Sequence, residues 1–333
     1  MGCGTDISKL RPRDAKVNNA ARSSTGAVSF MELYSLVTGL ISMKGRRGAL
    51  MLSMSIDHPD IMEFIDIKTN LDNVTNANIS VKITDEFMKK VENNEEHVME
   101  FFIESTGETI RRTVKAKDLL YKLAENNHRS GEPGMLFWDN ITSWSIMSED
   151  DDYEYAGVNP CGEQPLINGG SCNLASINLS KLAVNPFTDK AYVDFDKLKY
   201  LTDLGIKYLD EVVDDNIKNQ PLEIQKQMAE KYRNCGLGFL GLSDLLIKMG
   251  YEYGKEESIN LVDKIGRTMI EQALLTSTQL AEEKGAFPGC NVDAILQAPF
   301  VQENATEEIL ERIQNYGLRN SSLLSIAPTG LIN

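Results

Sequence analysis

Hydrophobic and polar residues follow two periods in the first half of the chain. Residues 78–83 alternate at a period of two, which predicts a strand with one buried face, and the apolar run 49–56 is also strand-like. The polar stretch 93–115 predicts a hairpin. Apolar residues at helical spacing predict helices, which fall at 29–42, 58–65, 85–92 and 116–130.

Helical spacing dominates the second half of the chain. Residues 323–326 are strand-like. In the first half of the chain, 137–139 form a short apolar segment, and the glycine-containing start at 2–8 predicts a loop. Strands that alternate with helices predict an α/β fold, of barrel or open-sheet type. The helices predicted in the second half are 198–213, 221–231, 239–249, 258–283 and 306–314.

Composition limits the kinds of protein that this chain can be. With 333 residues, 42% of them hydrophobic, it can form a real core as one large domain or two ordinary ones. It has no apolar run near the roughly 18 residues of a membrane span and no signal-peptide pattern, so we expect a cytoplasmic protein outside the membrane. The turn-like start and the abrupt end indicate an internal segment of a longer protein.

Charge and cysteine usage narrow the function further. The 49 acidic residues outnumber the 34 basic ones, and a net charge of -15 argues against a nucleic-acid partner while still allowing a single nucleotide to bind. The five cysteines form no dense framework and no Cys-x-x-Cys, and the three histidines lie far apart. We therefore expect neither a disulfide scaffold nor a metal site.

One short segment has the pattern of a reaction centre. Asn159, Cys161 and Glu163 alternate in sequence, so in an extended segment their side chains would share one face. Cys172 follows beyond a Pro and a Gly-Gly turn signal, and a hairpin-like return would bring the second thiol near the first. The bland interpretation, a cysteine that is only a small buried hydrophobe, is kept for Cys3, Cys235 and Cys290.

Two other segments are candidates for binding phosphate or nucleotide. Pro328-Thr329-Gly330 predicts a turn after a strand-like run, where backbone N–H groups could cradle a phosphate. Arg46 and Arg47 form a basic loop that would by default be solvated. The acidic run at 149–152 predicts only a solvated loop.

Four motifs in order resemble the large catalytic subunit of ribonucleotide reductase, and the likeness covers the whole chain. They are NPCGEQPL at 159–166, GSCNLASINL at 170–179, GLGFLGLSDLL at 236–246 and RNSSLLSIAPTG at 319–330, supported by STGAVSFM at 24–31 and GRRGALM at 45–51. The resemblance implies a ten-stranded α/β barrel, incomplete at both ends. Residues 1–150 would carry the effector and substrate loops and the first barrel half, and 151–333 the finger loop and part of the second half.

The resemblance also implies a chemistry, the reduction of ribonucleotides, as diphosphates, to 2′-deoxyribonucleotides by a thiyl radical. Cys161 would become the thiyl radical that abstracts the ribose 3′ hydrogen, and Glu163 would be the general base for the 3′ hydroxyl. Asn159 would bind the sugar hydroxyls. Cys172 would be one thiol of the reducing pair, whose partner in the family lies upstream of residue 1.

Further roles follow from the matching positions. Pro328, Thr329 and Gly330 would bind substrate phosphate, and the backbone of Gly2 and Gly4 would approach the substrate. Arg46 and Arg47 match the family's loop between effector and substrate base. These further roles rest only on the positions of the residues in the family motifs.

The cofactor and partners are also implied by the family. The motifs resemble the adenosylcobalamin-dependent class II, and the alternative is a class I subunit that binds no cofactor directly and takes its radical from a metal-containing partner subunit. Expected partners are a ribonucleotide substrate, a dNTP or ATP effector, a thioredoxin- or glutaredoxin-type reductant, a second copy in a homodimer, and a complementing chain with the missing barrel parts.

Two functions of other classes stay open on the sequence. One is a non-catalytic nucleotide-binding remnant. The other is an unrelated thiol oxidoreductase in which Cys161 and Cys172 form a simple disulfide couple. Glu163 distinguishes the thiol oxidoreductase from the reductase, because a plain dithiol couple does not need a carboxylate.

Overall fold

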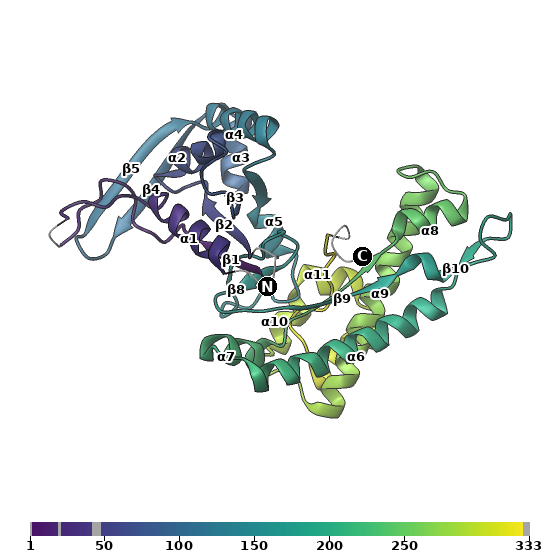
Figure 1. Ribbon diagram of the computed structural model, residues 1–333. Helices are drawn as coiled ribbons and strands as arrows, with labels where there is room; N and C mark the ends of the chain where they lie inside the picture. Colours follow the sequence, from purple (N-terminus) through teal and green to yellow (C-terminus); the bar gives the residue numbers. More distant parts are fainter. Residues whose placement is uncertain (1, 19–20, 42–47, 329–333) are drawn as a thin grey trace. The chain divides into compact units, whose positions relative to one another are not determined.

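The computed structural model describes residues 2–18, 21–41 and 48–328 of the chain. The chain divides into two units, Met1–Thr142 with Ala156–Pro165, and Ser143–Tyr155 with Leu166–Asn333. Each unit has its own hydrophobic core. Both mix strands with helices (Figure 1), so the predicted α/β class is confirmed.

The first unit is built on a four-stranded parallel sheet. Its order is β1 (Gly2–Asp6), β2 (Ala49–Ser55), β3 (Asn78–Ile83) and β6 (Gly134–Phe137). Five consecutive residues of β2 are buried, as expected for a parallel strand covered on both faces. The largest side chains of this core are Phe64 and Phe87.

Helices and a hairpin complete the first unit. Thr84 caps α3 by accepting a hydrogen bond from the Phe87 N–H, and α4 ends at Gly131 in the left-handed conformation, φ 78°. The predicted hairpin is the antiparallel pair β4 (Glu96–Ile103) and β5 (Glu108–Lys115). The helices are α1 (Ser29–Leu40), α2 (Ile61–Asp66), α3 (Asp85–Glu92), α4 (Ala116–Ser130) and α5 (Trp138–Ser143), with a 3-10 turn at Ile67–Thr69.

The second unit pairs a small sheet with long helices. β9 (Asn173–Asn178) and β12 (Cys235–Leu240) are parallel. Residues 322–325 run beside β12, joined to it by hydrogen bonds and one isolated bridge. The Cys235 N–H donates to the Ser322 carbonyl at 3.0 Å, and the Leu237 N–H donates to the Leu323 carbonyl at 2.9 Å. The strand predicted at 323–326 is therefore confirmed in part, with a bridge at Leu324.

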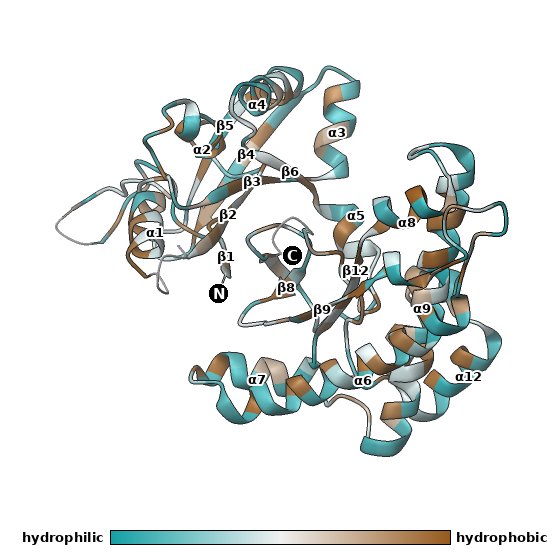
Figure 2. Cartoon of the chain, turned by 45° about the vertical axis from the view of Figure 1, so that its right-hand side comes forward, coloured by the Kyte–Doolittle hydropathy of each residue, from teal (hydrophilic) through white to brown (hydrophobic). Residues whose placement is uncertain are grey.

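Helix α6 (Phe195–Asn219) packs against both strands of this sheet, and α9 (Glu256–Lys284) packs against α6. Figure 2 shows helices of both units with hydrophilic and hydrophobic turns on the same helix, as expected when one face is buried. The small pair β10 (Ala183–Val184) and β11 (Tyr192–Val193) follows a 3-10 turn at Leu179–Leu182. The helices are α6 (Phe195–Asn219), α7 (Glu223–Tyr232), α8 (Leu242–Met249), α9 (Glu256–Lys284), α10 (Val292–Gln297), α11 (Pro299–Asn304) and α12 (Glu307–Tyr316).

Two predicted elements were wrong, and glycine explains both. Residues 2–6 form strand β1 instead of a loop. The loop was predicted from Gly2 and Gly4, but these glycines allow close packing against Pro160 and Val158 and do not form a turn. The helix predicted from residue 239 begins at Leu242, because Phe239 and Leu240 belong to β12. Gly241 separates the two elements in the left-handed conformation, φ 73°.

The strands of the described residues do not form a closed barrel. Their largest sheet has four strands, and the other pairings are two-stranded. Across residues 2–18, 21–41 and 48–328, every helix is too short or too polar to cross a bilayer.

Candidate active site

Cys161 lies in a tight turn between β7 (Tyr155–Val158) and β8 (Pro165–Ile167). The Gly162 N–H donates to the Asn159 carbonyl at 3.0 Å, which closes a four-residue turn. Asn first, Pro second and Gly fourth is a favoured order for a type I turn. The segment is therefore not extended as predicted. Pro160 and Gly162, whose φ is 83°, turn the chain, so strand alternation does not align these side chains.

The hairpin that carries Cys161, residues 156–165, is held against the sheet of the first unit. A Cβ on Gly4 would lie well inside 3.0 Å of the Val158 carbonyl oxygen, and a Cβ on Gly2 would overlap the ring of Pro160. The Asn78 side-chain amide donates to the Pro160 carbonyl at 3.0 Å. Gly2 and Gly4 thus allow the hairpin to pack closely against β1.

Lys82 forms a second anchor for the hairpin. Its Nζ donates to the Ala156 carbonyl at 3.3 Å and pairs with the Asp6 carboxylate at 2.8 Å, with both side chains 12% exposed. It also lies over the Trp138 ring, 4.4 Å from the ring centre. Asn78 and Lys82 occupy the polar face of β3, and the sequence analysis missed their role. The signal was present in the alternation of 78–83, which marks a polar face without showing what meets it.

Burial and a neighbouring negative charge both favour the protonated form of the Cys161 thiol. Burial of the sulfur and the negative charge of Glu163 together raise the pKa of Cys161 above its ordinary value. The residue is nevertheless exposed at the turn, so its S–H group is accessible. Glu163 is half-buried, and its Oε2 atom is sealed from solvent. The Cys161 thiol and the Glu163 carboxylate are therefore close enough to interact.

Asn159 uses part of its hydrogen-bonding capacity within the turn. Its Oδ1 accepts the Gln164 N–H at 3.0 Å, and its backbone N–H donates to the Gln164 carbonyl at 3.1 Å. The side-chain NH2 group is the part that can donate to a ligand. The turn thus fixes the orientation of this amide.

Cys172 lies just before β9 in the second unit. Its thiol is half-buried, donates to the Asn173 carbonyl at 3.6 Å, and faces β12, where a Cβ on Gly236 would lie 3.1 Å from the sulfur. All five cysteines lie in described parts of the chain, and none forms a disulfide. Cys235 is fully buried, as the bland interpretation predicted, whereas Cys290 is half-buried and Cys3 is exposed.

Of the remaining predicted site residues, only Pro328 lies within the described ranges. Arg46, Arg47, Thr329 and Gly330 lie outside the described residues. Pro328 is the last described residue and is exposed. Within the described ranges, His, Cys, Asp and Glu form no cluster of three or more able to hold a metal ion.

Residues 1–332 match the family described as "Ribonucleotide reductase, barrel domain". The chain belongs to this family. The predicted resemblance is therefore confirmed, and an unrelated thiol oxidoreductase is excluded.

Several relatives that the chain matches are named vitamin B12-dependent reductases. It is 35% identical over 334 residues to the vitamin B12-dependent ribonucleoside-diphosphate reductase of Thermoplasma acidophilum, and 33% identical over 334 residues to that of Mycobacterium tuberculosis (strain CDC 1551 / Oshkosh). A vitamin B12-dependent ribonucleotide reductase of Rhodopirellula baltica is 27% identical over 378 residues. Each match covers 100% of this chain, but only 40%, 44% and 35% of the respective relative.

Proposed function

We propose that the chain is the catalytic segment of a ribonucleotide reductase that converts ribonucleoside diphosphates to 2′-deoxyribonucleotides. The observation that carries this proposal is the accessible, protonated thiol of Cys161 in a turn anchored by Gly4, Asn78 and Lys82, with Glu163 beside it. Family membership and the names of the relatives support the substrate class.

Cys161 and Glu163 act on the 3′ carbon and its hydroxyl. As a thiyl radical, Cys161 takes the hydrogen atom from C3′ and becomes a thiol again. Glu163 accepts the proton of the 3′ hydroxyl, a role for which a half-buried carboxylate is suited. The Asn159 NH2 group donates to a sugar hydroxyl and holds the ring. At the end of the reaction the Cys161 S–H returns a hydrogen atom to C3′.

Cys172 supplies reducing equivalents. It and a second thiol provide two electrons and two protons and become a disulfide, while the 2′ hydroxyl leaves as water. The balance is one ribonucleotide and one dithiol to one deoxyribonucleotide, one disulfide and one water. A thioredoxin- or glutaredoxin-type protein then returns the disulfide to the dithiol.

Adenosylcobalamin is the proposed cofactor, in keeping with the names of the relatives. When bound, it supplies the radical that oxidises a thiol by removing a hydrogen atom. Cys161 fits this chemistry because a hydrogen atom can be taken only from the protonated thiol, and its pKa is raised. The alternative, a radical from a metal-containing partner subunit, would use the same exposed thiol.

Other residues bind the rest of the nucleotide in this proposal. Pro328, Thr329 and Gly330 bind the substrate phosphates, and the backbone of Gly2 and Gly4 lies beside the sugar. Arg46 and Arg47 carry the effector signal, from a dNTP or ATP, to the substrate base. Support for these roles is the match of each segment to the family motif.

The proposed assembly completes a ten-stranded barrel. Residues 1–150 form its first half with the effector and substrate loops, and 151–333 form the finger and part of the second half. A complementing stretch of chain supplies the remainder. We also propose a homodimer, because α1 exposes an apolar face that a second copy can cover: Phe30, Leu33, Leu36, Val37 and Leu40 are 41–73% exposed.

The test is an anaerobic assay of the reductase that contains this chain, with a ribonucleoside diphosphate, dithiothreitol and adenosylcobalamin. We expect one deoxyribonucleoside diphosphate for each dithiol oxidised, and no product when the cobalamin is left out. Tight nucleotide binding without any deoxyribonucleotide would instead identify a non-catalytic remnant. Product without cobalamin, but with a metal-containing subunit added, would identify the class I alternative.

A further inference from the structure

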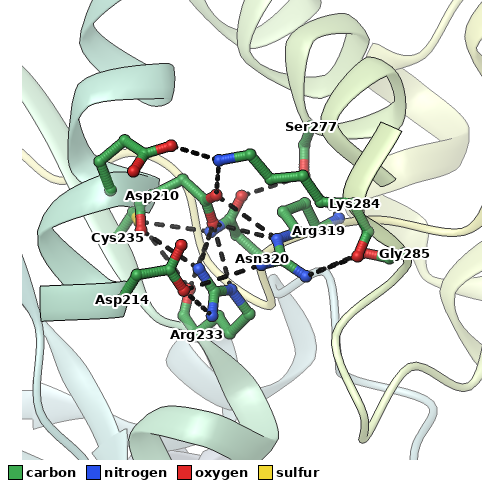
Figure 3. A network of polar contacts seen from close by, with 10 residues as sticks. Asp210, Asp214, Arg233, Cys235, Ser277, Lys284, Gly285, Arg319 and Asn320 are labelled. Carbon is green, nitrogen blue, oxygen red and sulfur yellow. Dashed lines mark hydrogen bonds and ion pairs between the residues drawn. The ribbon is translucent and has the colours of Figure 1, made fainter. Parts of the chain in front are cut away.

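A buried polar network in the second unit surrounds Asp210, which has no part in the proposed chemistry (Figure 3). Asp210 lies on α6 and is 0% exposed. Its Oδ1 accepts hydrogen bonds from Arg233 at 2.7 and 3.1 Å, and Arg319 donates to the same carboxylate at 3.3 and 3.4 Å. Lys284 of α9 donates to Oδ2 at 3.3 Å. Three cations therefore converge on one buried carboxylate.

Two further carboxylates balance the charge of the network. Asp214 pairs with Arg233 at 2.7 Å and with Arg319 at 3.8 Å, and Glu211 pairs with Lys284. Burial alone would raise the pKa of Asp210, but the hydrogen bonds of Arg233 and the nearby positive charges outweigh it and lower the pKa. The carboxylate is thus charged, and removing its charge leaves the cations uncompensated.

The network joins the starts of two neighbouring strands. Arg233 stands two residues before β12, and Asn320 stands two residues before the segment 322–325. The Asn320 amide donates to the Asp210 carboxylate at 3.3 Å, to the Arg233 carbonyl at 3.1 Å and to the Cys235 sulfur at 3.4 Å. The Ser277 hydroxyl of α9 donates to the side-chain Oδ1 of Asn320 at 3.3 Å and accepts the backbone N–H of Arg319 at 3.0 Å.

β12 lies against the proposed reducing thiol of Cys172, and the segment 322–325 leads to Pro328, where the proposed phosphate-binding segment begins. On β12, a Cβ at Gly236 would lie 3.1 Å from the Cys172 sulfur and 3.0 Å from Cβ of Ser325. The Ser325 N–H donates to the Leu237 carbonyl at 3.1 Å, and Pro328 follows three residues later. A shift between the strands would therefore move the surroundings of Cys172 and the start of Pro328-Thr329-Gly330.

We infer that Asp210 is a positioning residue: through Arg233, Arg319 and Asn320 it holds β12 and the segment 322–325 in register, and so sets the places of Cys172 and of Pro328. The inference rests on the proposed function. A positioning role is expected to be sensitive, because a displacement of about 1 Å at a reacting group can cost on the order of 100-fold in rate.

The test compares Asp210→Asn with Asp203→Asn in the active reductase. Asp203 is a matched control on the same helix, since it pairs with Lys207 at 2.9 Å and accepts a hydrogen bond from Thr276 at 3.0 Å. Neither of these partners belongs to β12 or to 319–325. Two quantities are measured in folded protein: KM for the ribonucleotide, and the alkylation rate of Cys235 followed by peptide mass spectrometry.

We expect Asp210→Asn to raise KM about tenfold and to speed Cys235 alkylation about tenfold, with Asp203→Asn within about twofold of wild type in both. A role in stability alone would lower the active fraction, and hence kcat, and leave KM unchanged. Either quantity at the wild-type level in folded Asp210→Asn enzyme overturns the inference. An inactive wild-type enzyme defeats the proposed function instead, which separates the two failures.

A milder variant decides the question if Asp210→Asn does not fold. Ser277→Ala removes one hydrogen bond to Asn320 and one to the Arg319 N–H and leaves every charge in place. We expect it to raise both KM and the Cys235 alkylation rate about threefold. Wild-type values of either quantity for Ser277→Ala would then reject the positioning role.

Discussion

Gly4 of β1 and Val158 of β7 are in backbone contact: the Val158 carbonyl oxygen occupies the space where a side chain of residue 4 would begin. Together with the hydrogen bond from Asn78 to the Pro160 carbonyl, this contact fixes the turn that carries Cys161. The glycine at position 4 is thus a condition for the placement of the thiol. Gly4 matters because it has no side chain and so lets the hairpin approach β1 closely, and not because of its backbone flexibility.

Gly4→Ala is expected to destabilise the first unit by at least about 2 kcal/mol, because overpacking against backbone cannot be relieved by a side-chain movement. Urea unfolding measures the change. Gly266→Ala is the control, since a Cβ there meets nothing within 4 Å and lies within α9. Alanine at position 266 should stabilise the protein by up to about 1 kcal/mol. Equal effects of the two substitutions would contradict the packing argument.

Lys82→Met should destabilise the first unit by about 3 kcal/mol, because it leaves the half-buried Asp6 carboxylate without its cation. The double variant with Asp6→Asn should lose less than the sum of the two single variants, with a coupling of roughly 1–2 kcal/mol. A double-mutant cycle in urea measures this coupling. Strict additivity would show that Lys82 and Asp6 do not stabilise each other.

Glu163→Gln should lower the pKa of Cys161, because it removes one of the two causes that raise it and leaves only burial. A lower pKa gives more thiolate, so iodoacetamide should alkylate Cys161 about twofold or more faster at about pH 8. Cys3, exposed in the same protein, serves as the internal reference. An unchanged or slower reaction at Cys161 would mean that the two side chains do not interact.

The stabilisation contributed by the Asp210 network should depend on pH. The folded-state pKa of Asp210 is lowered, so its contribution is present above the ordinary carboxyl pKa of about 3.9 and is lost as the pH falls through the lowered value. The difference in free energy of unfolding between wild type and Asp210→Asn should therefore be largest near neutral pH and shrink in acid. A difference that stays constant with pH would contradict this assignment.

Elements with strong local signals were predicted closely. The alternation of 78–83 gave β3 at its observed bounds, and the Thr84 cap and the left-handed Gly131 mark the ends of α3 and α4. β12 was mistaken in part for helix because Gly236 and Gly238 weaken a strand signal. These glycines are needed where residues distant in the sequence pack closely against β12: a Cβ on Gly238 would collide with the Ser325 carbonyl.

The roles of the candidate site residues stay predictions, whereas the geometry of their segment differs from the one expected. The motif located Asn159, Cys161 and Glu163, but the expected extended segment is a turn, although Pro160 and Gly162 carried that signal. The anchors Asn78 and Lys82 could not be found in advance, because each lies more than 70 positions from its partner carbonyl. No local pattern specifies a contact of that separation.

The most direct test of the central claim is deoxyribonucleotide formation by Cys161→Ser beside Cys290→Ser in the reductase that contains this chain. A serine O–H bond is too strong to give up its hydrogen atom in place of the thiol, so the account predicts a folded Cys161→Ser enzyme without measurable product. Cys290→Ser, which removes a half-buried thiol outside the proposed site, should keep its activity. Wild-type turnover by Cys161→Ser would contradict the assignment of the radical thiol.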